Sequence, residues 1–232
     1  MLKMRRAARA KKIAWALIVA IVMSCVPAPT ANHLAYADAV FAGGSGIDGD
    51  PFQIHTAEQL NNVRNNLNSH FILLNDIDLT GYLSEAGAGW NDGAGWAPIG
   101  TSGSRFAGVF DGAEYRITGL HINRPTSENV GLFGSTNVAQ IQNVEVWGVS
   151  ITGGSYVGGL IGRASGTTVS QCGVSGVVTG TGDLYTGGLI GYSWGGSIYR
   201  CYSSANVTAP NRVGGLVANS SQTSYTDCYA TG

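Results

Sequence analysis

Lysine is absent after Lys12, and charged residues make up only 12% of the 232 residues. After residue 37 the chain contains seven arginines and fourteen acidic residues, which gives this part a formal net charge of −7. Nucleic acids and anionic membranes are bound by clustered basic side chains that displace counterions. We therefore expect no nucleic-acid partner, and no membrane contact beyond the N-terminal segment described below.

Two motifs that would identify an enzyme are also missing. The sequence has no His-Glu-x-x-His zinc-protease motif and no phosphate-binding loop, and Gly43-Gly44-Ser45-Gly46 follows no predicted strand. No segment after Asn66 keeps a helical period. We therefore expect no catalytic residue, no metal and no cofactor in this chain, and a fold without long helices.

The first 37 residues differ in composition from the rest. Six basic residues lie within the first twelve positions, and Ile13–Val26 is a mainly apolar run of 14 residues. Such a run is shorter than the about 20 residues that span a bilayer, and Ala35-Tyr36-Ala37 supplies a small-x-small cleavage site. Residues 1–37 are therefore predicted to be a signal peptide of an exported protein. A retained N-terminal anchor and a lipid-modified Cys25 are the alternatives.

The chain contains a repeated phrase of glycine followed by two apolar residues. Successive copies follow one another at nearly regular intervals, which is typical of a solenoid in which one repeat is one coil. The 35 glycines suit a fold with many tight corners. The copies are Gly108-Val109-Phe110, Gly131-Leu132-Phe133, Gly159-Leu160-Ile161, Gly188-Leu189-Ile190 and Gly215-Leu216-Val217.

A second phrase, apolar-x-x-apolar-x-apolar, also recurs along the chain. Its alternation and its β-branched residues are typical of short strands. Together the two phrases predict an all-β fold, a right-handed parallel β-helix over residues 71–232 with about six coils, the last one incomplete. The copies are Leu74/Ile77/Leu79, Ile117/Leu120/Ile122, Ile141/Val144/Val146, Val169/Cys172/Val174, Ile198/Cys201/Ser203 and Tyr225/Cys228/Ala230.

The repeat glycines have a structural explanation in such a fold. At a coil corner the backbone turns sharply, often with positive φ, and each corner lies on the one below, so a Cβ would clash in every layer. We therefore interpret Gly108, Gly131, Gly159, Gly188 and Gly215 as structural residues and not as a binding motif.

Residues 38–70 are predicted to be a lead-in and a capping helix. Thr56-Ala57-Glu58-Gln59 has the spacing of a capping box, and apolar residues follow it at helical intervals. We expect a short helix from Thr56 to about Asn66. A solenoid needs such a cap because an uncovered terminal coil exposes apolar interior and unpaired strand edges.

Cys172, Cys201 and Cys228 recur with the period of the glycine phrase, at the position that Val144 occupies one repeat earlier. The favoured interpretation is a ladder of buried side chains, in which cysteine acts as a small apolar residue. A disulfide between adjacent coils and a metal site are the alternatives, although no nearby histidine would complete a metal site.

Asp76 and Asp78 alternate with apolar residues, so both carboxylates should point outward from one strand. Outward acids could bind Ca²⁺ or act in acid-base cleavage of a polysaccharide. Position counting places Gly119 and His121 beside them in the next coil, and no cluster of acids with several arginines is predicted. A solvated strand face is the favoured interpretation.

Between residues 80 and 105 the spacing of the phrases expands, which predicts an inserted loop. Long loops on rigid scaffolds often carry binding residues, and exposed tryptophans with acids suit sugar stacking. Tyr82, Trp90 and Asp92 are therefore candidate binding residues, whereas Trp96 is expected to pack against the end of the β-helix.

The repeats resemble the Glug repeat, which is named for its Gly-Leu-apolar-Gly core. Asp111 and Ala218 replace the last glycine of this core in the first and last copies. The chain also stops at Gly232 within a coil, so we expect a fragment of a longer protein. The matching copies are Gly131-Leu132-Phe133-Gly134, Gly159-Leu160-Ile161-Gly162 and Gly188-Leu189-Ile190-Gly191.

This resemblance implies a bacterial protein that is exported or attached to the cell surface, in which the repeats form a β-helical stalk or an adhesive module. Such repeats also accompany a zinc metallopeptidase of the immunoglobulin A protease type. A carbohydrate-active β-helix is a third possibility, and it requires a basic residue and acids that converge on one groove. We favour a non-catalytic, extracellular surface module whose partner is a host or environmental glycan or protein.

Overall fold

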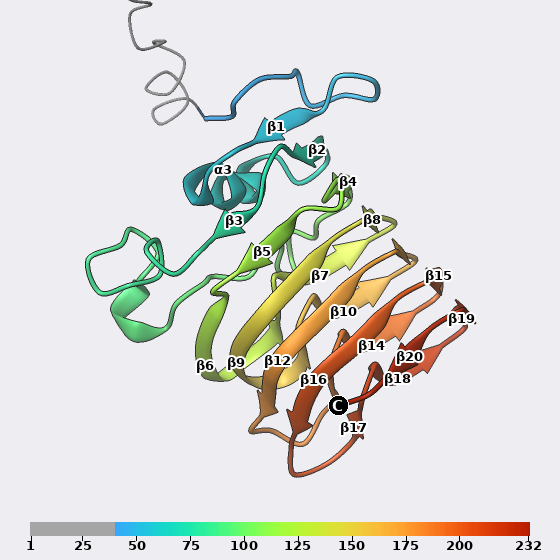
Figure 1. The fold of residues 1–232 in the computed structure, drawn as a ribbon. Helices are drawn as coiled ribbons and strands as arrows, with labels where there is room; N and C mark the ends of the chain where they lie inside the picture. The colour runs from blue at the N-terminus through green and yellow to red at the C-terminus, as the bar shows by residue number, and fades with distance from the viewer. Residues whose placement is uncertain (1–39) are drawn as a thin grey trace, which may run out of the picture. The chain divides into compact units, whose positions relative to one another are not determined.

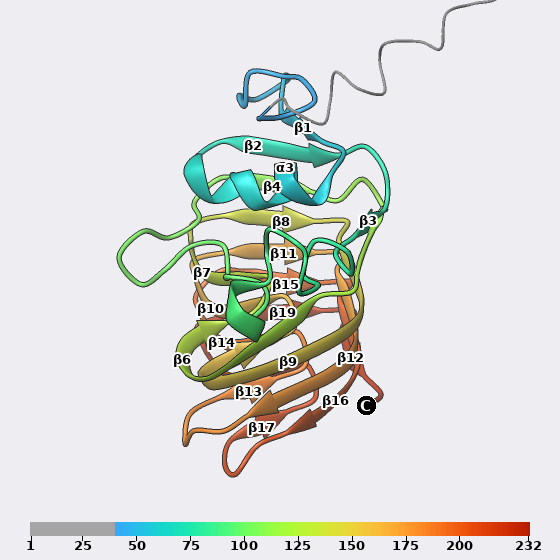
Figure 2. The same ribbon diagram turned by 90° about the vertical axis from the view of Figure 1, so that its left-hand side faces the viewer.

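The computed structural model describes residues 40–232, so the predicted signal peptide lies outside the described residues. This part of the chain is a stack of coils made of short parallel strands, as Figures 1 and 2 show from two sides. The predicted parallel β-helix with a short N-terminal helix is thereby confirmed.

Three sheets, here named A, B and C, form the walls of the stack. Sheet A consists of β1 (Phe52–Ile54), β2 (His70–Leu73), β4 (Val109–Asp111), β8 (Gln140–Gln142), β11 (Thr168–Ser170), β15 (Ser197–Tyr199) and β19 (Ser224–Thr226). Sheet B consists of β7 (Phe133–Asn137), β10 (Ile161–Ser165), β14 (Ile190–Trp194) and β18 (Val217–Ser221).

Sheet C is the longest and the least regular of the three. Its strands are β3 (Ile77–Asp78), β5 (Arg116–Thr118), β6 (His121–Val130), β9 (Glu145–Gly158), β12 (Gly173–Gly180), β13 (Thr186–Gly187), β16 (Tyr202–Thr208), β17 (Val213–Gly214) and β20 (Tyr229–Ala230). Because β9 is long, it pairs with both β5 and β6 on one side and with β12 and β13 on the other.

Each coil passes through sheets B, A and C in that order. Four coils of residues 40–232 contribute a strand to every sheet, beginning at β7, β10, β14 and β18. In the winding before β7, single bridges from Ile99 to Phe133 and from Phe106 to Thr136 take the place of a sheet B strand. Sheet A therefore starts earlier along the chain than sheet B does.

Ladders of equivalent apolar side chains fill the interior. In sheet A, Phe71 pairs with Phe110 and Phe110 with Ile141, and all three are at most 1% exposed. Aromatic rings fill the N-terminal coils, where Phe106 lies 6.1 Å from Phe71 and 5.0 Å from Phe133 between ring centroids. Burial of each such side chain contributes about 1.5–3 kcal/mol, so the ladders stabilise the stack.

The predicted helix is present as α3 (Ala57–Asn62), and a 3₁₀ turn (Val63–Asn65) continues it. The Thr56 hydroxyl accepts a hydrogen bond from the Gln59 backbone N–H at 3.3 Å, which caps the helix start. Leu60 and Val63 are fully buried at the N-terminal end of the core. No helix of residues 40–232 has the length and apolar composition that crossing a bilayer requires.

The backbone conformation at the corners differs from the prediction. None of the five repeat glycines, all of which lie in the described part, has a positive φ. Positive φ instead occurs at other corner positions, and at the corner between sheets A and C this position is occupied by non-glycine residues. These residues are Asn143, Gln171, Arg200 and Asp227, with φ between 52° and 54°.

Close stacking accounts for the repeat glycines. A Cβ on Gly159 would lie 2.6 Å from the carbonyl oxygen of Gly188 and 2.4 Å from a methyl carbon of Val174. A Cβ on Gly188 would lie 2.2 Å from the carbonyl oxygen of Gly215. Contacts this short are excluded for real Cβ atoms, so each coil approaches the next only where the side chain is missing.

The sequence had suggested that Gly108 is equivalent to the other four repeat glycines, but the structure places it differently. Phe110, two residues later, pairs in sheet A with Ile141, whereas Phe133 pairs in sheet B with Ile161. The interval from Gly108 to Gly131 is shorter than those between the later copies, and it reflects this difference. A Cβ on Gly108 would nonetheless lie 2.0 Å from the carbonyl oxygen of Ser69.

Gly159→Ala is expected to destabilise the fold by about 1–3 kcal/mol, because the added methyl group forces two coils apart. Gly81→Ala is the matched control, since Gly81 has no positive φ and no atom within 4 Å of its Cβ position. The measurement is the free energy of unfolding in urea. Equal losses in the two variants would contradict the stacking explanation.

Candidate functional site

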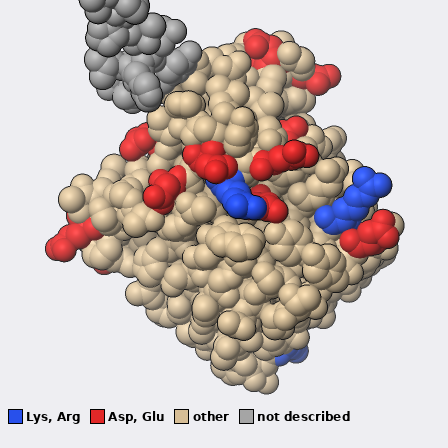
Figure 3. Space-filling view, viewed as in Figure 1, with Lys and Arg blue, Asp and Glu red and all other residues tan. Residues whose placement is uncertain are grey.

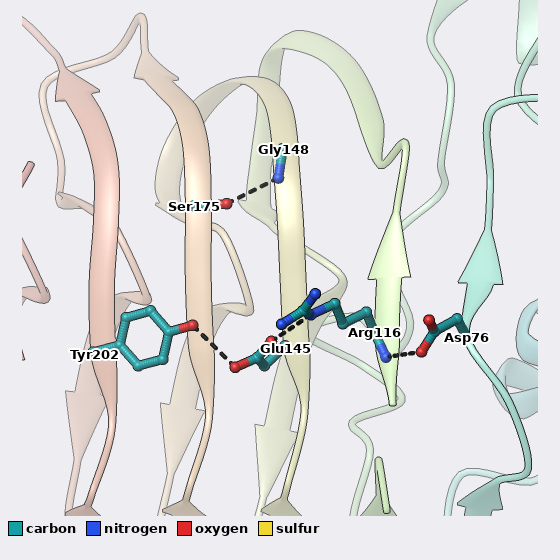
Figure 4. A network of polar contacts seen from close by, with 6 residues as sticks. All are labelled: Asp76, Arg116, Glu145, Gly148, Ser175 and Tyr202. Atoms are coloured by element: carbon teal, nitrogen blue, oxygen red, sulfur yellow. Dashed lines mark hydrogen bonds and ion pairs between the residues drawn. The ribbon is translucent and has the colours of Figure 1, made fainter. Parts of the chain in front are cut away.

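A polar network crosses several coils on the outer face of sheet C (Figure 4). Arg116 of β5 pairs in register with Glu145 of β9, and Gly173 of β12 pairs with both Glu145 and Tyr202 of β16. The network residues therefore occupy one equivalent position in successive coils. In Figure 3 a basic side chain near the middle of this view is surrounded by acidic ones.

The contacts within the network are short and continuous. The Asp76 carboxylate accepts from the backbone N–H of Arg116 at 2.9 Å, and Arg116 Nε donates to Glu145 Oε2 at 2.7 Å. The Tyr202 hydroxyl donates to Glu145 Oε1 at 3.1 Å. This last contact skips one coil, and Gly173 makes it feasible, because a Cβ there would lie 2.3 Å from the Tyr202 ring.

Aromatic rings extend the network on both sides. The Arg116 guanidinium carbon lies 5.3 Å from the ring centroid of Trp147, whose side chain is 48% exposed. Tyr202 stacks on Tyr229 with 5.6 Å between centroids and 13° between planes. This face thus offers both a cation–π pair and a stacked aromatic pair to solvent.

The charges on this face are already matched to one another. The hydrogen bond and the charge of Glu145 raise the pKa of Arg116. Burial, and then the charge and the hydrogen bond of Glu145, raise the pKa of Tyr202 to about 12. At neutral pH the arginine is charged and the tyrosine is protonated, so neither side chain is available as a base.

A shallow groove of about 340 Å³ lies beside the ion pair. One basic residue and two acids, the minimum that a carbohydrate-active β-helix would need, converge here, but the lining contains no histidine and no second arginine. Both oxygens of Glu145, however, accept hydrogen bonds within the network. The arrangement is therefore suited to linking coils and binding polar ligands. The groove is lined by Glu114, Arg116, Asn143, Glu145 and Gln171.

This cluster was not predicted, because the second phrase aligns two coils in the wrong register. Ile117 pairs with Ile77 and Val146, not with the Ile141 position that the second phrase suggested. The neighbour of Asp78 in the next coil is consequently Thr118, and His121 pairs instead with Ser150. The short spacing after Gly108 was the signal that could have revealed the shift.

Asp78 points outward, as predicted, but it belongs to a local turn. Its Oδ1 atom accepts from the backbone N–H of Thr80 at 2.9 Å, and hydrogen bonds from Thr80 lower the pKa of this carboxyl. Asp76 and Asp78 thus have different partners, because Asp76 contacts Arg116.

The inserted loop places its candidate residues apart from the network. Trp96 is 1% exposed, and its indole N–H donates to the carbonyl oxygen of Leu132 at 3.1 Å, so it packs into the core. Tyr82 meets Trp96 edge to face at 6.3 Å, and burial raises its pKa. Trp90 is half-buried and Asp92 is exposed at a positive φ of 53°. A binding role for Tyr82, Trp90 and Asp92 remains a prediction.

The three repeated cysteines are free thiols. Cys172 and Cys201 are fully buried, Cys228 is half-buried, and burial raises the pKa of Cys172. Their Sγ atoms donate to backbone carbonyl oxygens, for example from Cys172 to Ser170 at 3.1 Å. Within residues 40–232, no three His, Cys, Asp or Glu side chains gather closely enough to bind a metal ion.

One motif of hydrolases is present in the sequence but not in its structural setting. Gly191-Tyr192-Ser193-Trp194-Gly195 has the Gly-x-Ser-x-Gly spacing of a nucleophile elbow, in which serine is exposed between a strand and a helix. Here Ser193 lies in β14 and is 1% exposed. Its hydroxyl is hydrogen-bonded to the Thr223 hydroxyl at 3.0 Å, which makes it a core residue.

Comparison with known proteins identifies the repeat. Residues 182–208 match the family model of the GLUG motif, and they cover one coil from the loop before β13 to the end of β16. The chain therefore carries the motif that its glycine phrases had suggested.

Two curated relatives share part of the chain. A "Putative Gly-rich membrane protein" of Evansella cellulosilytica is 43% identical over 133 residues, which are 55% of this chain and 15% of that protein. Halomucin of Haloquadratum walsbyi is 34% identical over 144 residues, which are 59% of this chain and 2% of that protein. The chain thus spans only a small part of the length of these relatives.

A solved structure has the same fold. It is titled as a crystal structure of a "putative immunoglobulin A1 protease" from Bacteroides ovatus, with a TM-score of 0.55 and 18% sequence identity. The match covers 84% of this chain and 79% of the solved one. At this identity the likeness concerns the fold alone.

Glu145→Gln is expected to lower the pKa of Tyr202 from about 12 toward, but not to, its ordinary value of 10.0, because burial remains. Since the folded state keeps this proton more tightly than the unfolded state, stability is lost as the pH rises from 10.0 to about 12. The variant should lose less stability over this range. Ultraviolet titration of tyrosinate and urea unfolding measure the two effects.

Glu128→Gln is the control for that prediction, since Glu128 is an exposed acid of β6 outside the network. An unchanged titration of Tyr202 in Glu145→Gln, or an equal change in both variants, would show that the network does not set this pKa.

Proposed function

We propose that this GLUG-motif protein is a non-catalytic module of an exported bacterial surface protein, in which the β-helix acts as a rigid scaffold. Relatives named as a membrane protein and as a halomucin support a place at the cell surface. The predicted signal peptide supports export.

The observation that carries this proposal is the continuity of the stack. Parallel strand pairs connect every neighbouring coil in sheets A, B and C from β7 to β20. Each coil contacts mainly its neighbours, so added coils lengthen the module without changing its cross-section. Ladders of outward side chains remain available to solvent along the whole length.

Side-chain contacts between coils support a rigid rather than a flexible spacer. The Arg116–Glu145 pair is a surface pair, with side chains 55% and 30% exposed, so on its own it contributes little to stability. The ion pair connects β5 to β9, and the hydrogen bond from Tyr202 to Glu145 connects β16 to β9 across one coil. The network thus fixes three strands of the outer face relative to one another.

Surface display is tested by labelling intact bacterial cells that express the chain with an antibody against residues 38–232. We expect labelling without lysis, because the signal peptide directs export. A variant that lacks residues 1–37 is the control, and it should be labelled only after lysis.

Labelling that requires lysis for the unaltered chain would contradict export to the surface. Cleavage of immunoglobulin A1 or of a polysaccharide by the purified chain, with loss of cleavage in Glu145→Gln, would contradict the non-catalytic role. The two outcomes are independent, so each part of the proposal can fail separately.

A further inference from the structure

Two ladders of polar side chains lie next to each other where sheet C returns to sheet B. The first is formed by the residues that precede the paired positions Val130, Val157, Thr186 and Val213. These residues are Asn129, Tyr156, Tyr185 and Arg212. The second ladder contains the paired residues Ser135, Arg163, Tyr192 and Asn219 of sheet B.

Rings and guanidinium groups of the two ladders contact one another. Tyr185 stacks on Tyr192 at 5.4 Å with 25° between planes, and Tyr156 lies 5.8 Å and 5.9 Å from these two rings. Arg163 lies over Tyr156 at 5.5 Å and over Tyr192 at 5.7 Å. Arg212 lies over Tyr185 at 5.1 Å. We call these five residues the Tyr/Arg stripe.

The two arginines of the stripe have no acidic partner. Among residues 40–232, the ion pair between Arg116 and Glu145 is the only one within 4.0 Å. Asp183, which precedes Tyr185 by two residues, accepts from Asn211 Nδ2 at 3.2 Å instead of pairing with an arginine. Among the described arginines only Arg116 has an ion pair, so the feature that distinguishes Arg163 and Arg212 is their position over neighbouring tyrosine rings. Two such cations close together form a local site for anions.

A pocket of about 390 Å³ adjoins the first ladder at Asn129. The Asn129 side chain is 8% exposed, its Nδ2 donates to the Ser102 hydroxyl at 3.0 Å, and its buried Oδ1 has no hydrogen-bond partner. Leaving a buried acceptor unpaired costs about 1–3 kcal/mol, so a ligand that donates a hydrogen bond is favoured there once a movement of the Asn129 side chain exposes Oδ1 to the pocket. Other lining residues are Pro98, Thr101, Arg124, Ser127 and Glu128.

The pocket lies one coil from the stripe along the stack. Val130, which follows Asn129, pairs directly with Val157, which follows Tyr156, so the two sites are one coil apart. Adjacent parallel strands are about 4.8 Å apart, and the ladder from Asn129 to Arg212 therefore extends over roughly 14 Å. A linear ligand that follows the stack would contact the five residues of the stripe.

We propose that this surface binds an acidic polysaccharide. A sugar hydroxyl donates to Asn129 Oδ1, sugar ring faces pack on the tyrosines, and carboxylate or sulfate groups pair with Arg163 and Arg212. Each chemical feature of such a chain thus has a matching group on the surface. The scaffold role proposed above does not require this binding, so the two proposals can fail independently.

The test measures binding of the full chain to immobilised polygalacturonate, with neutral dextran as the second probe. The double variant Arg163→Gln with Arg212→Gln should bind polygalacturonate about tenfold or more weakly, because it loses two charge-assisted contacts. Asn129→Gly, which keeps the positive φ of 57° at this position, should also bind more weakly. Binding by the unaltered chain should fall as salt is added.

Arg200→Gln is the matched control. Arg200 is an exposed arginine outside the stripe, and Gln171 occupies the equivalent corner with the same backbone conformation one coil earlier. This variant should bind polygalacturonate like the unaltered chain. Unfolding midpoints in urea establish that each variant is folded.

A second measurement uses only the unaltered chain and is independent of variant folding. Bound polygalacturonate should protect Arg163 and Arg212 from an arginine-specific dicarbonyl reagent, while Arg200 stays reactive, as peptide mass spectrometry would show. The proposal is overturned by absence of polygalacturonate binding, by equal binding of dextran, by an equal loss in Arg200→Gln, or by uniform reactivity of the three arginines.

Discussion

The close approach of successive coils is the constraint on which the rest of the structure depends. Parallel backbone pairing brings each coil onto the next, and at four of the five repeat glycines a carbonyl oxygen of one coil occupies the space of a Cβ in its neighbour. Glycine is required there because a Cβ has no room, and not because of its backbone conformation, since φ at these glycines is not positive. Once these positions are fixed, the strand register follows, and with it the equivalence of outward side chains that builds both polar surfaces.

Much of the coil architecture could be predicted because every coil has the same close approach to its neighbour and the same buried interior. The phrases at Gly131, Gly159, Gly188 and Gly215 precede equivalent strands of sheet B, and Cys172 and Cys201 follow Val144 on the same buried ladder. The corner conformation could not be predicted in this way. Positive φ lies at the residue before each cysteine, where side chains are polar but vary in size and charge.

The candidate sites were harder to predict, because they depend on register between unlike coils. Arg116 and Glu145 are neighbours only because the partner of Ile141 in the preceding coil of sheet A is Phe110 and not Ile117. The inserted loop and the missing sheet B strand before β7 break the period at that point. The Tyr/Arg stripe, in contrast, follows the regular period, since Tyr156, Tyr185 and Arg212 recur at the same intervals as Gly159, Gly188 and Gly215. A periodic search for aromatic and basic residues would have found it.

Disulfide trapping tests the register most directly. Arg116 and Glu145 are partners on adjacent strands, which are about 4.8 Å apart and so within the about 4.4–6.8 Å that a disulfide spans. The double variant Arg116→Cys with Glu145→Cys should form an intramolecular disulfide on mild oxidation, as peptide mapping would show. Arg116→Cys with Gln140→Cys, the pair that counting along the second phrase would bring together, should not. A disulfide in the second variant and none in the first would contradict the coil stacking described here.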